Sequence, residues 1–367
     1  MLRNSLLLSL LLVTSPVWAA PAIVTTQGLI TNDSVVTITG SGFGTKGSAA
    51  PLVWHNFANG AAPSGLAANS ISVFNNTDNP RTIASAYTTR FDHKLGGSDF
   101  FSYNTTAYPQ WYVAYWIRLA SNWHWGTTTS GGADDGLANI KFFRAFPTGA
   151  RSYTNFGYTF HGWGSRETQR FFETPASGNV YLTLLSTWLT LNTWHLMEWE
   201  YGENSAVDVA DGSTKLWVDG NLKDSSTTII TNYGVDGTAV NKRPYIIGIY
   251  DSWPPSDAAV ANMYAYIAEV YVDNSWSRVA LCDVSVWANC THREIQRPSA
   301  WSDSSITITA NTGTFINDTV YLYVVDSAGV VNATGFAVQL GPPASSRKPV
   351  TRTPATRTPV TRTPVAR

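Results

Sequence analysis

The sequence predicts an all-β protein built from two β-sandwiches. Segments rich in aromatic and β-branched residues recur along the chain between turn-forming residues, and helical periodicity is hard to find. Asp219-Gly220 separates two such segments, and this dipeptide tolerates positive φ at both central positions of a hairpin turn. Many short strands at close spacing are typical of a sandwich or barrel.

The first 19 residues have the features of a signal peptide. Arg3 supplies the positive start, Leu6 to Val13 form a short apolar stretch, and the small residue Ala19 suits cleavage. No later apolar stretch reaches the roughly 20 residues that a membrane-spanning helix needs. We therefore expect a secreted protein, extracellular or periplasmic, with no membrane span.

The charge is unevenly distributed along the 367 residues. Of the 24 basic residues, Arg3 lies in the leader and six lie in residues 347–367, which contain no acid; 17 basic residues and all 25 acidic residues remain, a net of −8 for the body. The negative net charge of this part of the chain disfavours binding to nucleic acid, because it repels the phosphate backbone. Residues 342–367 carry a five-residue Thr/Arg/Pro repeat that predicts a disordered tail, either solvated or in contact with an acidic surface.

The two ends of the chain differ from its middle. The segment Gly40-Ser-Gly-Phe-Gly44 follows a predicted strand and resembles the opening of an IPT/TIG immunoglobulin-like (Ig-like) domain. Residues 22–49 and 293–341 together have the size of one such sandwich, which predicts a split domain with residues 50–283 inserted. The alternative is that these segments add strands to one large sandwich.

Residues 50–283 contain an ordered set of strands. The expected strands lie at 111–119, 155–161, 180–185, 194–201, 215–218, 245–250 and 264–272. Trp194-His-Leu-Met-Glu-Trp-Glu200, Lys215-Leu-Trp-Val-Asp-Gly220 and Tyr266-Ile-Ala-Glu-Val-Tyr-Val-Asp273 resemble laminin-G-like (LamG-like) and concanavalin A-like jelly rolls. The resemblance implies a two-sheet sandwich with a concave face. That superfamily includes lectins, glycosidases and polysaccharide lyases, among which the fold does not choose.

Several tryptophans lie in segments rich in glycine or proline. Trp123 and Trp125 stand in Ser121-Asn-Trp-His-Trp-Gly126, Trp163 lies between two glycines, and Trp253 precedes two prolines. Such segments favour exposed turns, and aromatic rings stack on sugars. We expect these tryptophans to line a polysaccharide groove; the alternative is that they cap the sandwich edges.

Cations within strand patterns indicate either anionic ligands or ion pairs. Arg118 shares a strand face with Trp116, and Lys141 and Arg144 flank two phenylalanines. These side chains suit a uronate, although they could equally be residues at a sheet edge or partners in salt bridges.

A polysaccharide lyase needs a group that neutralises the uronate carboxylate, a base and an acid. Tyr245-Ile-Ile-Gly-Ile-Tyr250 resembles the lyase strand that ends in Gly-x-Tyr. The resemblance implies Tyr250 as the acid/base, with His161 and Arg144 as candidate partner base and neutraliser. The chain departs from that pattern at Ile246, where a lysine is expected.

A glycosidase would need two carboxylates across the scissile bond. Glu198 and Glu200 share a strand face, but the intervening Asp of jelly-roll glucanases is missing. If the chain is an enzyme, a lyase is therefore favoured over a glycosidase.

Cys282 and Cys290 are the two cysteines of an exported chain, so we expect a disulfide. We expect no required cofactor; structural calcium is compatible with the acidic residues, but no ligand loop has a recognisable spacing. The leading hypothesis is a secreted polysaccharide-binding protein. The alternatives are a lyase acting on a uronate-containing polymer and a non-catalytic surface adhesion module.

Overall fold

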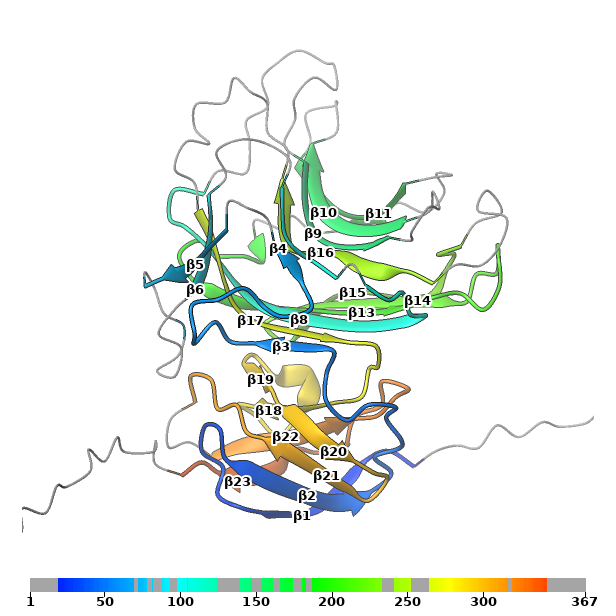
Figure 1. Cartoon of the computed structure of the whole chain (residues 1–367). Coiled ribbons are helices and arrows are strands. Elements are labelled where there is room, and N and C mark those ends of the chain that lie inside the picture. The colour runs from blue at the N-terminus through cyan, green and yellow to red at the C-terminus, as the bar shows by residue number, and fades with distance from the viewer. Residues whose placement is uncertain are drawn as a thin grey trace, which may run out of the picture.

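The computed structural model contains two stacked β-sandwiches, the larger above the smaller in Figure 1. It describes residues 19–68, 72–77, 81, 88–92, 98–103, 105–123, 139–146, 153–160, 166–173, 180–182, 187–232, 241–251, 264–315 and 319–341. The cleavage segment before Ala19 and the basic tail lie outside these ranges. Within them, no helix is long and apolar enough to cross a membrane.

The larger sandwich has two antiparallel sheets, and the prediction of an all-β, jelly-roll fold is confirmed. The seven-stranded sheet runs in the order β12 (Val180–Leu182), β11 (Arg166–Glu173), β10 (Tyr153–Phe160), β9 (Asn139–Phe146), β16 (Arg243–Asp251), β7 (Ser98–Ser102) and β4 (Ala67–Ala68). The eight-stranded sheet contains β15 (Asn221–Ile229), β14 (Gly212–Val218), β13 (Trp194–Gly202), β8 (Gln110–Leu119), β17 (Tyr264–Asp273), β6 (Thr88–Asp92) and β5 (Ser72–Asn76), with β3 (Val53–His55) paired to β17.

The smaller sandwich draws its strands from both ends of the described chain. One sheet is β1 (Ala22–Gln27), β2 (Val35–Ser41), β21 (Ser305–Thr309) and β20 (Arg297–Trp301). The other is β19 (Arg293–Ile295), β18 (Arg278–Cys282), β22 (Thr319–Val325) and β23 (Phe336–Gln339), with the short 3₁₀ helix η4 (Trp287–Asn289) nearby. The sequence boundary is corrected here, because β18 pairs with β22 and so belongs to this sandwich, although we expected it within 50–283.

Strand β8 is buried on both faces, which explains its nearly continuous apolar sequence. Trp111, Val113 and Tyr115 enter the core between the two large sheets. Tyr112 and Trp116, in the opposite phase, enter a second cluster that includes Ile295 of the small sandwich. Because side chains alternate across a strand, the eight-stranded sheet packs on the seven-stranded sheet with one face and on the small sandwich with the other.

Two sequence signals are explained by local geometry. Asp219 and Gly220 have φ of 50° and 71°, and Val218 pairs with Asn221, so the hairpin predicted at this dipeptide is confirmed. Phe43 is fully buried in the core of the small sandwich. Gly40 before it has no room for a side chain, since a Cβ there would lie 2.0 Å from the carbonyl oxygen of Ala22.

The predicted disulfide between Cys282 and Cys290 is confirmed, and it lies in the small sandwich. Both cysteines are buried and pack against Tyr323. The bridge ties the end of β18 to the segment that follows η4.

We expect the double variant Cys282→Ser/Cys290→Ser to lower the free energy of unfolding by about 2–3 kcal/mol, because closing a loop of this length restricts the unfolded chain. Urea unfolding of both proteins without reductant measures the difference. Equal stability of the two would contradict a stabilising role for the bridge.

Candidate functional site

The outer face of the seven-stranded sheet brings together several cations and aromatic rings. In β9, Phe143 and Ala145 are buried in the core between the sheets. Arg144 and Phe146 alternate with them and are half-buried on the opposite face. This face is directed away from the small sandwich (Figure 1).

Arg144, Phe146 and Tyr245 form a platform on this face. The guanidinium carbon of Arg144 lies 4.9 Å from the centroid of the Phe146 ring, and the rings of Phe146 and Tyr245 lie 5.4 Å apart. Arg243 of β16 pairs directly with Phe146, so a second guanidinium shares the face. Half-buried rings beside cations suit the apolar face and the carboxylate of an acidic sugar.

The backbone register places Tyr250 beside Lys141. Tyr250 of β16 pairs with Lys141 of β9, which pairs in turn with Gly157 of β10. Phe156 pairs with the core residue Phe143, and Gly157 is the next residue along β10. Because successive positions of a strand face opposite sides of the sheet, the row Tyr250–Lys141–Gly157 belongs to the outer face. The pairings of β9 with β16 and with β10 each contain a register shift, which places Lys141 on the outer face. The alternation of residue types in the sequence does not reveal such a shift.

Sequence reasoning did not single out two residues whose backbone pairs with these rows. Asn155 of β10 pairs with Arg144, and Gln169 of β11 pairs with Gly157. Lys141 is 4% exposed, whereas Arg144 is half-buried. Their positions along β9 are three residues apart, which corresponds to about 10 Å. The positive charges of Lys141 and Arg144 are therefore spread along β9 and do not form one cluster.

The tryptophan groove finds no support in the described residues. Trp123 is only 5% exposed and belongs to the core between the sheets, so the prediction that it faces solvent is wrong. A turn from Ala120 to Trp123 carries this large apolar ring back into the core despite its polar neighbours. Trp125, Trp163, Trp253 and His161 lie outside the described residues.

Arg118 does not join the other cations. It lies on β8, in the eight-stranded sheet, and its guanidinium donates a hydrogen bond to Asn192. The structure therefore separates Arg118 from Lys141 and Arg144, with which the sequence grouped it.

Glu198 and Glu200 form buried ion pairs at the junction of the two sandwiches. Glu198 is bound by Arg293 at 3.1 Å and accepts a hydrogen bond from Tyr112 at 2.9 Å. Glu200 is bound by Arg278 at 2.8 Å. Both carboxylates are at most 2% exposed, which leaves no room for a sugar between them. This arrangement argues against a glycosidase that uses this pair.

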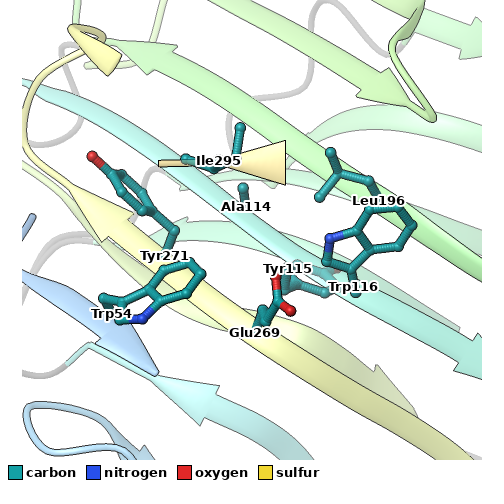
Figure 2. Close-up of a pocket in the computed structure, with 8 residues that line it drawn as sticks. All are labelled: Trp54, Ala114, Tyr115, Trp116, Leu196, Glu269, Tyr271 and Ile295. Carbon is teal, nitrogen blue, oxygen red and sulfur yellow. The ribbon is translucent and has the colours of Figure 1, made fainter. Parts of the chain in front are cut away.

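Glu269 is the extra residue of a β-bulge in β17. Its φ is 56°, and the register with β8 shifts between Ala268 and Val270. The bulge directs the Glu269 carboxylate into the junction, where it lies 2.6 Å from the Arg81 guanidinium. The same guanidinium also binds the Glu294 carboxylate, at 2.5 Å. Burial raises the pKa of Glu269 against the attraction of Arg81. Glu269 lines a small cavity (Figure 2), whose volume of about 10 Å³ is the size that one water needs.

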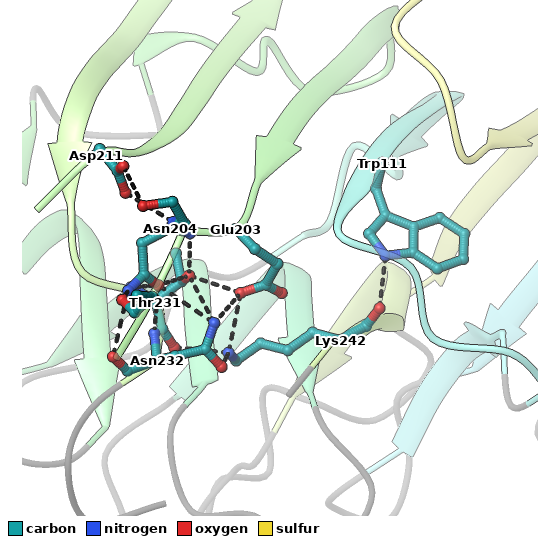
Figure 3. Close-up of polar contacts among 9 residues, drawn as sticks. Trp111, Glu203, Asn204, Asp211, Thr231, Asn232 and Lys242 are labelled. Carbon is teal, nitrogen blue, oxygen red and sulfur yellow. Dashed lines mark hydrogen bonds and ion pairs between the residues drawn. The ribbon is translucent and has the colours of Figure 1, made fainter. Parts of the chain in front are cut away.

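A second polar network anchors the start of β16 (Figure 3). The Lys242 ammonium donates to the Thr231 carbonyl at 2.6 Å and to Glu203 at 3.2 Å. Glu203 also accepts a hydrogen bond from the Thr231 hydroxyl at 2.6 Å. The Trp111 indole N–H donates to the Lys242 carbonyl at 2.6 Å, which ties the core to the strand that carries Tyr245 and Tyr250.

Comparisons with known proteins give fold neighbours without close relatives. No family model and no curated protein matches the chain. Among solved structures, a variant of alginate lyase Aly36B in complex with alginate tetrasaccharide is 12% identical, covering 62% of this chain and 98% of its own, with a TM-score of 0.38. The endo-β-1,4-glucuronan lyase of Trichoderma reesei is 13% identical, covering 71% and 92%, with a TM-score of 0.30. The cellulose-induced protein Cip1 is 12% identical, covering 57% and 90%, with a TM-score of 0.32. At these scores we infer neither substrate nor activity from the likeness.

We expect Glu203→Gln to show a pH-dependent effect on stability. Burial raises the pKa of Glu203 above its usual 4.5, against the attraction of Lys242. A raised pKa in the folded state contributes stability that is fully present below 4.5 and is lost as the pH rises through the folded value. The difference in unfolding free energy, wild type minus Glu203→Gln, should therefore fall as the pH rises.

Asp211→Asn is the matched control for this measurement. Hydrogen bonds from Ser205 lower the pKa of the exposed Asp211, so the difference between wild type and this variant should shrink as the pH falls. Urea titrations from about pH 2.5 to 8 cover both slopes, the one of Asp211 below its ordinary pKa of 3.8 and the one of Glu203 above 4.5. A wild-type minus Glu203→Gln difference that rises with pH would contradict the assignment.

Proposed function

We propose that this is a secreted protein whose jelly-roll domain binds a uronate-containing polysaccharide on the outer face of the seven-stranded sheet and cleaves it by β-elimination. The observation that carries the proposal is the register that sets Tyr250 opposite Lys141, three residues along β9 from Arg144. A tyrosine in backbone register with a lysine, with an arginine three residues along the same neighbouring strand, supplies the types of group that this reaction needs.

Each group has a role in the proposed reaction. Arg144 neutralises the uronate carboxylate and makes the adjacent C–H more acidic. Tyr250 is the acid/base: it removes the C5 proton and returns a proton to the leaving glycosidic oxygen. The C4–O bond breaks and a C4=C5 double bond forms, so no water is consumed and no redox partner is needed.

Lys141 compensates for one departure from the lyase-like strand. The sequence has Ile246 where a lysine is expected on the strand of Tyr250, and Lys141 lies on the neighbouring strand in direct register with Tyr250. An ammonium there favours the phenolate form of the tyrosine and attracts the carboxylate of the substrate. We propose that Lys141 serves these two purposes.

Non-catalytic polysaccharide binding is the second candidate. The half-buried rings of Phe146 and Tyr245, held beside Arg144, support it without any role for Tyr250. Under either candidate the small sandwich, which we interpret as an IPT/TIG-like module, serves as a support, and a structural calcium ion remains compatible with both.

We expect the purified protein to release products with an unsaturated uronate chromophore from alginate, glucuronan or pectate, followed by ultraviolet absorbance. Tyr250→Phe should lower the rate by about 10²–10⁴-fold, because it removes the proton-transfer group while keeping the ring. Tyr108→Phe, whose ring packs against Trp111 away from this face, is the control and should retain activity.

Affinity electrophoresis in gels of the same polymers separates the two candidates. Retardation that Tyr250→Phe leaves intact, with no absorbing product from the wild type, would replace the lyase with a binding protein. Failure of all three polymers to retard the protein or to yield a product would contradict both candidates.

A further inference from the structure

We propose that the cavity at the junction of the two sandwiches is a second carbohydrate site, which takes a neutral sugar unit. The cavity has a volume of about 350 Å³ and is lined by residues of both sandwiches. This volume lies within the range of about 300–1,000 Å³ that small-molecule sites occupy. Its lining residues Trp116 and Trp194 belong to the eight-stranded sheet, whereas the outer face described above belongs to the seven-stranded sheet.

Two indole rings form the apolar part of the cavity. Trp116 of β8 and Trp194 of β13 lie on neighbouring strands and in the same phase, because Leu196, two residues after Trp194, pairs with Trp116. One face of Trp116 is covered by Arg81, whose guanidinium carbon lies 3.5 Å from the ring centroid. Trp194 is half-buried and lines the cavity, so its ring is the candidate stacking surface.

The polar part of the cavity consists of hydroxyl and imidazole groups. Thr193, Thr291 and Thr314 are exposed residues at its rim. The Thr291 hydroxyl donates to Asp283 at 2.5 Å, which leaves its oxygen lone pairs to accept from a ligand. Hydroxyls that donate and accept around an aromatic ring match the edge of a sugar ring.

The imidazoles of this cavity are fixed by their own partners. The Nδ1 of His195 lies 2.6 Å from Asp219, and the Nε2 of His292 lies 2.7 Å from Glu294. The Asp219 carboxylate also accepts a hydrogen bond from the Leu196 N–H at 2.9 Å and is 28% exposed. Rings held in this way preorganise the wall of the cavity.

The charge of the cavity selects a neutral ligand. Arg81 is its one guanidinium among the described residues, and two carboxylates, Glu269 and Glu294, already bind it. Asp219 adds a third carboxyl group, so the carboxyl groups at and behind the cavity outnumber its guanidinium. A uronate would meet repulsion here, whereas the outer face carries Lys141, Arg144 and Arg243. We infer that the two sites take different sugars.

The test is calorimetric titration of the full protein with cellotetraose, xylotetraose, mannotetraose and arabinotetraose, alongside an alginate tetrasaccharide. We expect one or more of the neutral sugars to bind. Trp194→Ala should weaken that binding at least tenfold, and Trp194→Phe should recover part of it. Trp301→Ala, a half-buried tryptophan on β20 that does not line the cavity, is the matched control and should bind as the wild type does.

Two further variants separate this site from the proposed active face. Thr314→Val removes a rim hydroxyl with little change in shape and should weaken neutral-sugar binding by about three- to tenfold. Tyr250→Phe should leave it unchanged. Thermal unfolding of each variant checks that the fold is retained. Absence of binding by all four neutral sugars, or equal binding by Trp194→Ala and Trp301→Ala, would overturn the proposal whatever the elimination assay shows.

Discussion

The structure depends on the ion-paired contact between the eight-stranded sheet and the small sandwich. Arg278 with Glu200, Arg293 with Glu198, and Arg81 with Glu269 and Glu294 place buried charges from one sandwich against those of the other. Charges removed from water in this way are tolerated only when each has its partner. The pairs therefore define one relative orientation of the sandwiches, and a sliding displacement would leave several charges unpaired. Because this contact occupies one side of the jelly roll, the opposite sheet is the side on which the cations collect.

The buried ion pairs at this contact determine how the two sandwiches are oriented more than they add to the stability of the fold. A well-packed apolar contact of similar volume would give comparable stability, but it would permit several relative positions of the two sandwiches. Lys46 and Asp273 illustrate the balance: they are 2.5 Å apart and fully buried, and burial lowers the pKa of Lys46 and raises that of Asp273. Both shifts favour the uncharged forms, so desolvation outweighs the attraction in each case. We infer that the ion pairs at the junction fix the orientation of one sandwich relative to the other.

Much of the fold could be predicted from the sequence because its signals are local. Strand composition, the Asp219-Gly220 turn and the cysteine pair each depend on neighbouring residues, and each is confirmed. The same local reasoning failed at Trp123, since glycine and polar neighbours indicate a loop but do not decide whether its ring turns inward. It also missed that β8 is buried on both faces, although its almost uninterrupted apolar run was a signal for this.

The candidate site needed information that only pairing supplies. Lys141 and Tyr250 are 109 positions apart, and their alignment depends on register shifts in two ladders that leave no mark in either strand. Arg81 contacts Glu269 of β17, Glu294 of β19 and Trp116 of β8, and no pattern in the sequence indicates these three partners. Long-range partners of this kind follow from topology, and local propensity does not determine them.

The origin of the small sandwich has a mechanical consequence. Its strands β1 and β23 are the first and last strands of the described chain, and the jelly roll is entered after β2 and left before β18 (Figure 1). A pulling force applied between β1 and β23 would pass from one sheet of the small sandwich to the other, through contacts such as the Ile30–Leu340 bridge, and would bypass the jelly roll while those contacts hold. The jelly roll would keep its shape while the small sandwich carried the tension.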